Sequence, residues 1–109
     1  MNDLVNRIQN LIPEMRQLAH EIEEWDSKKV AADRDYKKLK AQEALKDRAE
    51  GMAVGMIEMT VGGKENVADA CYERDFAEVM SNAKKELLYV AKLESRLLEG
   101  QAQREWGVD

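Results

Sequence analysis

The feature that most constrains this 109-residue sequence is a regular spacing of apolar side chains in its N-terminal half. Between residues 4 and 39, apolar residues recur at alternating steps of four and three, and only Lys29 breaks the series. The series is Leu4, Ile8, Leu11, Met15, Leu18, Ile22, Trp25, Lys29, Ala32, Tyr36 and Leu39. These steps place all members on one face of a long α-helix, as in a coiled coil, whereas a strand would require alternation. The next position is Glu43, so we expect the apolar face to drift or change register there.

A second series with the same spacing follows in the C-terminal half and predicts a second helix. Its members are Phe76, Met80, Ala83, Leu87, Val90, Glu94 and Leu97. Asn66, followed three residues later by Asp69, is the predicted N-cap of this helix. The helix is expected to end either at Gly100 or near Arg104.

Pro13 lies inside the first series and lacks the backbone donor that a helix interior requires. Either the helix kinks just before it, or a short helix ends there and the main helix starts at Pro13, where proline is favourable. The apolar series keeps its phase across the proline, which favours the kink.

The segment between the two series, "MAVGMIEMTVGG" (residues 52–63), carries one charge in a chain that is 36% charged. Arg48 and Gly51 indicate a helix end just before it. Residues 56–61 suit a strand and the following glycine pair suits a tight turn, so we expect a small β-hairpin or a packed loop at this tip. Its low polarity predicts that the tip is covered by the chain itself or by a partner. The candidate partner contacts are Met52, Met56, Met59, Val61 and, in the tail, Trp106.

Together these observations predict an all-α fold, an antiparallel helical hairpin of coiled-coil type. We expect a single domain over residues 1–109, with arms 4–50 and 66–104, a tip 51–65 and a tail 105–109. Two helices cannot bury the apolar residues outside the two series, which predicts a homo-oligomer, a dimer or higher, such as a four-helix bundle. These residues are Val5, Ile12, Val30, Leu45, Val79, Leu88, Leu93 and Leu98. The alternative is that they are ordinary scattered surface residues.

The formal net charge is −5, which argues against unspecific binding to nucleic acid. Residues 26–50 nevertheless carry eight bases and six acids, a local charge of +2. This stretch is either a solvated helix face or a contact for an acidic partner or a nucleic acid, and direct nucleic-acid binding stays open. The candidate basic contact face is Lys28, Arg34, Lys37, Lys38 and Lys40.

The sequence predicts no catalytic, metal or cofactor site, and hence a protein that is not an enzyme. "VGGKEN" lacks the earlier glycine and the hydroxyl residue of a phosphate-binding loop. His20 is the only histidine, so "HEIEE" cannot supply a zinc-protease pair. The single cysteine, Cys71, has no internal disulfide partner and fits a reducing compartment. No signal-like or membrane-spanning apolar run is present, so we expect a cytoplasmic protein.

The order of these elements resembles a known family. A helix containing Pro13, then "YKKLK" at residues 36–40, a glycine-bearing turn and "KENVADACYERDF" at residues 64–76 is similar to small helical-hairpin proteins that phages encode in DNA recombination and replication modules. The resemblance implies a non-enzymatic accessory scaffold in the host cytoplasm, with a single-strand-binding protein or an annealing or recombinase protein as partner. At the turn, Glu65 and Asn66 stand where the family pattern has a threonine.

Two alternatives remain. The linker "VGMIEMTVGGKE" resembles that of prefoldin β-type subunits, which would imply a chaperone or holdase. The chain could also be a purely structural oligomerisation module. Secreted hairpins with Trp-x-Gly in the turn fit less well, because the only Trp-Gly pair here, at residues 106–107, is terminal.

Overall fold

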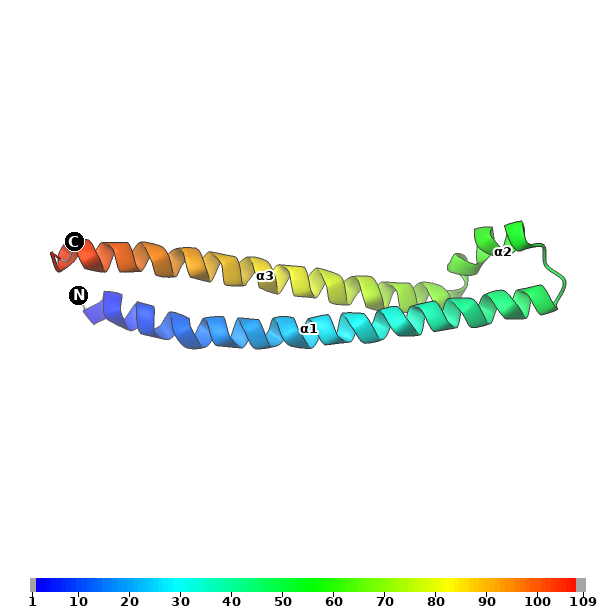
Figure 1. The fold of residues 1–109 in the computed structure, drawn as a ribbon, viewed down its shortest axis with the longest axis horizontal. Coiled ribbons are helices and arrows are strands. Elements are labelled where there is room, and N and C mark those ends of the chain that lie inside the picture. The colour runs from blue at the N-terminus through cyan, green and yellow to red at the C-terminus, as the bar shows by residue number, and fades with distance from the viewer. Residues whose placement is uncertain (1, 108–109) are drawn as a thin grey trace. The chain divides into compact units, whose positions relative to one another are not determined.

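In a computed structural model, which describes residues 2–107, the chain is helical almost throughout. The elements are α1 (Asn2–Ala49), α2 (Val54–Thr60), a short 3-10 turn η1 (Val61–Gly63) and α3 (Glu65–Glu105) (Figure 1). Residues 2–107 contain no strand. The predicted all-α helical hairpin is therefore confirmed, while the β-hairpin alternative for the tip is wrong, because a short helix takes its place.

The chain divides into two compact units, and α1 and α3 contribute to both. Unit 1 combines Met1–Glu24 with Met80–Asp109, and unit 2 is Trp25–Val79. In each unit the two helices run side by side in opposite directions, since partner numbers fall along α3 as they rise along α1 (Figure 1). The ion pairs that show this are Arg7–Glu94 (2.7 Å) and Glu21–Lys84 (2.8 Å) in unit 1, and Lys29–Glu78 (3.6 Å) and Asp33–Arg74 (3.6 Å) in unit 2.

The inward face of α1 follows the predicted series. Leu11 is fully buried and the other members, Lys29 included, are half-buried. After Leu39 the face drifts by one residue, as expected: Glu43 and Ala44 are half-buried, and the next buried residue is Asp47, at 4% exposure, where an unchanged series would require Lys46. Leu45 does not join the face and is 71% exposed. The face therefore continues through the two carboxylates.

Pro13 lies within the continuous helix α1. The alternative in which the main helix starts at Pro13 is therefore wrong. A proline in a helix interior removes one hydrogen bond and crowds the preceding turn. Packing against α3 in unit 1 offsets that cost, since the nearby Leu11 has no exposed surface.

The inward face of α3 lies one residue away from the predicted series. Its buried members are small or polar: Val67, Ala77, Ser81, Ala91 and Ala102. Small side chains let two helices approach closely, and this explains why they line the contact although each contributes little apolar area. The larger predicted residues remain outside, at 40% exposure for Phe76 and 73% for Leu97. One residue is about 100° around a helix, so the predicted series lies at the edge of the contact and not at its centre. Phe76 still meets the Trp25 ring of α1 edge-on at 5.7 Å, and Glu94 still pairs with Arg7.

The exposed apolar residues of α3 form a group in each unit. In unit 1 we call them the outer stripe, which consists of Leu87, Val90, Leu93 and Leu97. Their steps of three and four place them on one side of the helix. In unit 2, Tyr72, Phe76 and Val79 are exposed with the same spacing.

The helix ends have clear local causes. Gly51 has a φ of +92° after the end of α1, and the amides of Gly51 and Met52 donate to the carbonyls of Arg48 (3.0 Å) and Asp47 (3.1 Å). This is the glycine-terminated helix end that the sequence predicts. At the start of α3 the prediction of Asn66 as N-cap is wrong, because the helix already begins at Glu65. α3 then runs past Gly100 to Glu105.

Candidate functional site

The tip of unit 2 is fastened by one lysine, Lys64, which immediately precedes α3. Its ammonium lies 2.6 Å from Oδ1 of Asp47 and 3.0 Å from Oε2 of Glu43, both on α1. The side-chain amide of Asn66 donates to Oε1 of Glu43 at 2.9 Å. Hydrogen bonds from Asn66 and Lys64 lower the pKa of Glu43, and those to Asp47 and Glu43 raise the pKa of Lys64. We call these four residues the Lys64 clasp.

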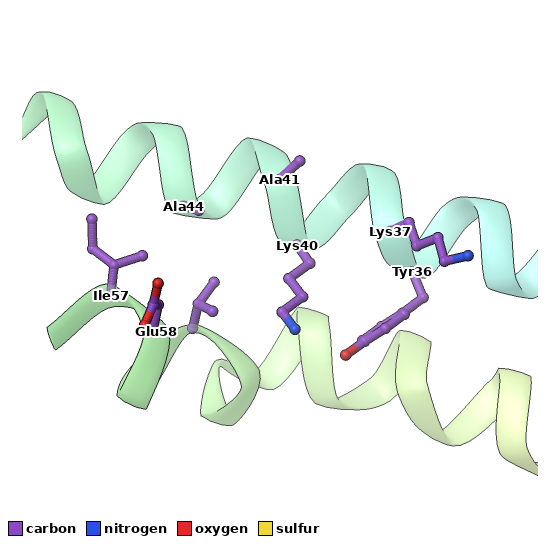
Figure 2. A pocket seen from close by; sticks show the side chains of 8 residues that line it. Tyr36, Lys37, Lys40, Ala41, Ala44, Ile57 and Glu58 are labelled. Atoms are coloured by element: carbon purple, nitrogen blue, oxygen red, sulfur yellow. The ribbon is translucent and has the colours of Figure 1, made fainter. Parts of the chain in front are cut away.

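Beside the clasp, α1 and the α2–η1 segment enclose an open groove of about 530 Å³, which we call the tip groove. It is lined by Tyr36, Lys37, Lys40, Ala41, Ala44, Ile57, Glu58 and Val61. Figure 2 shows Ile57 pointing from α2 toward α1, while Tyr36 and Lys40 point from α1 toward the start of α3. Ile57 and Val61 are buried, so they anchor the short helix to α1. The two alanines leave the α1 wall low, and this produces the hollow.

Cations gather around the aromatic ring in the tip groove. The Lys40 ammonium lies 5.7 Å from the Tyr36 ring centroid and the Arg74 guanidinium 4.5 Å from it. Lys37 pairs with Asp33 at 2.9 Å, which lowers the pKa of that carboxyl. Lys40 has no carboxylate partner among residues 2–107. The groove therefore combines an apolar floor with positive charge at its rim, and Glu58 is the one acid in its lining.

The predicted partner contacts are placed unevenly. Met59 is 82% exposed and Met56 is 51% exposed, both on α2, while Met52 is half-buried near Thr60. Val61 is buried at 3% exposure and therefore does not face a partner. Trp106 is 44% exposed but belongs to unit 1. The structure thus exposes Met56 and Met59 on the tip helix and places Trp106 in the other unit.

The predicted basic residues are all exposed on the α1 segment of unit 2, but only two of them line the tip groove. Lys37 and Lys40 do so. The Lys28 ammonium lies 4.3 Å from the Trp25 ring centroid, and Arg34 lies 3.8 Å from Asp35. The sequence alone did not single out Tyr36, Ala44 or Ile57 as groove residues, because their role depends on where α2 folds back.

The remaining reactive side chains lie apart. His20 Nε2 is 3.0 Å from Glu24 on the same helix, and the half-buried Cys71 lies 3.5 Å from Asp75. Within the described part of the chain, no three residues of the His, Cys, Asp and Glu types are grouped as a metal site requires. No helix between residues 2 and 107 has the length and apolarity needed to cross a membrane.

The fold and its exposed surfaces define the class of protein: an all-helical hairpin that presents apolar helix faces and a basic-rimmed groove. The chain matches no known family model, no curated protein and no solved structure. The resemblance to phage hairpin proteins therefore stays a prediction.

Proposed function

We propose that this protein is a non-enzymatic helical-hairpin module that self-associates and works through protein–protein contacts. The observation that carries the proposal is the outer stripe of α3, because it repeats the spacing of a helix contact face and yet remains exposed. Its four residues are 53%, 56%, 38% and 73% exposed for Leu87, Val90, Leu93 and Leu97. Burial of apolar surface stabilises an association by about 25 cal/mol per Å².

The position of the stripe favours a second copy as its occupant. On the α1 segment of unit 1, Ile12 is the one large apolar residue among those described that is clearly exposed. α3 therefore has a second apolar face and α1 does not. A two-fold dimer pairs the same patch of both copies, and an α3–α3 contact would bury the stripe from each side at once.

The accessible area agrees with such an interface. The chain exposes 7920 Å², whereas a monomer of 12.5 kDa typically exposes about 6200 Å². The excess of about 1700 Å² is larger than the roughly 800 Å² that each partner buries in a standard interface. The exposed surface is therefore large enough to include an interface of standard size.

The test compares two identical substitutions at equally exposed leucines. Leu97→Glu places a charge in the outer stripe, and Leu45→Glu places one on α1 outside it, at 71% exposure. Light scattering after size exclusion should give a multiple of 12.5 kDa for the wild type and Leu45→Glu, and a single-chain mass for Leu97→Glu, with equal helix content by circular dichroism. A wild type that stays a single chain at every concentration, or equal dissociation by both variants, would overturn the proposal.

For its cellular role we propose an accessory scaffold in phage DNA recombination or replication, located in the host cytoplasm. The support is the resemblance of the "YKKLK" and "KENVADACYERDF" segments to that family. The protein should then co-purify with a single-strand-binding protein or an annealing protein from the same module, and Met56→Ser with Met59→Ser should weaken this if the tip is the contact. Absence of either partner from a pull-down with the wild type would refute it.

The prefoldin-like alternative loses its main support in the structure. It rests on the resemblance of the linker to that of prefoldin β-type subunits, which is a β-hairpin, whereas this linker folds as α2 and η1. We therefore favour the scaffold over a holdase. A purely structural oligomerisation module would show the same mass as the scaffold but no partner in the pull-down.

A further inference from the structure

We propose that the tip groove binds an acidic segment of a partner protein in which carboxylates alternate with apolar side chains. This inference rests on the proposed contact function and names the chemistry of the partner. The observation behind it is that one groove combines an apolar floor with lysines whose charges are not fully neutralised by carboxylates.

The floor of the groove suits apolar side chains of a peptide. Ala41 and Ala44 project little from α1, and Ile57 closes the far side (Figure 2). A branched or aromatic side chain of a partner can rest over the two alanines, and Met56, which precedes Ile57 on α2 and is 51% exposed, is available to extend that contact. Methionine side chains adapt to irregular apolar partners because they are unbranched and flexible.

The rim suits carboxylates. Lys40 forms no ion pair among residues 2–107, so its ammonium can donate to an external carboxylate without breaking one. Lys37 shares its charge with Asp33 but keeps a side chain that is 73% exposed. The whole chain has a net charge of −5, so an acidic partner is repelled elsewhere and attracted to this basic stretch. Charge complementarity of this kind raises the association rate and depends on salt.

A nucleic acid fits the groove less well than a peptide does. Binding to a phosphate backbone uses a row of cations along a strand, and the groove offers two lysines with Glu58 opposite them. The apolar floor would also remain unused by phosphates. The acidic peptide uses both features, so the observations favour it.

The experiment measures the affinity of a fluorescein-labelled synthetic peptide of alternating aspartate and leucine by fluorescence anisotropy. Lys40→Glu should weaken binding by about tenfold or more, because it removes the free cation and adds repulsion. Lys38→Glu makes the same charge change outside the groove lining and should alter the affinity less than about twofold. Glu58→Gln should strengthen binding, since it removes the acid opposite the lysines.

Two further peptides and one oligonucleotide make the result specific. A peptide with asparagine in place of aspartate should bind weakly, and so should one with serine in place of leucine. An oligothymidylate should not displace the peptide. Equal losses for Lys40→Glu and Lys38→Glu, equal binding of the asparagine peptide, or displacement by the oligonucleotide would each overturn the groove proposal.

The same variants separate this inference from the proposed self-association. Lys40→Glu should keep the oligomeric mass of the wild type, and Leu97→Glu, in the other unit, should keep the affinity for the peptide. A wild type that forms the oligomer but does not bind the peptide overturns the groove proposal and leaves self-association intact. A single-chain wild type that binds the peptide as expected overturns self-association alone.

Discussion

At the residue scale, Lys64 is the side chain that connects the start of α3 to α1. Its ammonium contacts two carboxylates of α1, and one of them, Asp47, is buried. A buried charge that loses its partner is strongly destabilising, because it can neither pair nor be hydrated. The sequence could exclude a phosphate loop at "VGGKEN", but it could not predict the clasp, since the partners lie 21 and 17 residues earlier.

We therefore expect Lys64→Met to lower the melting temperature by about 5 °C or more, because Asp47 is left buried without a cation. Thermal unfolding followed by circular dichroism measures this. Lys38→Met, a change of the same size at an exposed lysine without a carboxylate partner in the described chain, should shift it by less than about 2 °C. Equal melting temperatures for both variants would show that the clasp is dispensable.

At the scale of elements, the two long helices show what apolar spacing can and cannot predict. The α1 series marks the inward face correctly, because its large residues, such as Leu11, meet the partner helix. The α3 series lies one residue away from the centre of the contact, because the buried residues there are small ones such as Ala77 and Ala91, while large members such as Leu97 remain exposed. Spacing identifies an apolar face of a helix but not what covers that face. When a helix has a contact face and a second apolar face, the spacing alone does not show which of them meets the partner helix.

The tip helix α2 was not predictable for a different reason. It has seven residues, no side-chain cap hydrogen bond and residues that suit a strand. A helix this short is not stable alone and depends on tertiary contacts. The buried Ile57 and the following Val61 of η1 line one groove with α1 residues far away in the sequence, so this groove was not predictable either. The basic residues of the rim were identified in advance because charge can be counted directly.

If Ile57 anchors the tip, Ile57→Ala should destabilise it by about 2–4 kcal/mol, the usual cost of removing a large buried aliphatic side chain. Hydrogen exchange of the amides in residues 54–61 reports this local opening directly. Met59→Ala, at 82% exposure on the same helix, should leave the exchange rates nearly unchanged. Similar acceleration in both variants would contradict the anchoring role.

At the scale of the whole molecule, paired carboxylates support both units. The guanidinium of Arg7 lowers the pKa of Glu94, and Lys84 followed by Gln17 lowers that of Glu21, both in unit 1. In unit 2, Lys37 lowers the pKa of Asp33, and Asn66 with Lys64 lowers that of Glu43. A carboxyl whose pKa is lower in the folded state stabilises the fold above its unfolded pKa, and this stabilisation is lost as the pH falls through the folded pKa.

The chain should accordingly keep its stability from neutral pH down to the ordinary glutamate pKa of 4.5, and lose it progressively below that value. Urea unfolding at a series of pH values measures the effect as a falling midpoint. Glu94→Gln removes one of these carboxylates, so its midpoint should be lower at neutral pH and should fall less steeply in acid. A midpoint that rises below pH 4.5 would contradict the assignment.

The outer stripe also affects the expected abundance of this protein in a cell. If the stripe pairs with a second copy as proposed, a newly made copy that is still single displays Leu87, Val90 and Leu97 to the surroundings. Chaperones and degradative proteases act on chains with such uncovered patches, so abundance depends on stability and coverage. Surplus copies would be cleared and assembled ones spared, which would match the steady-state level to the number of completed complexes.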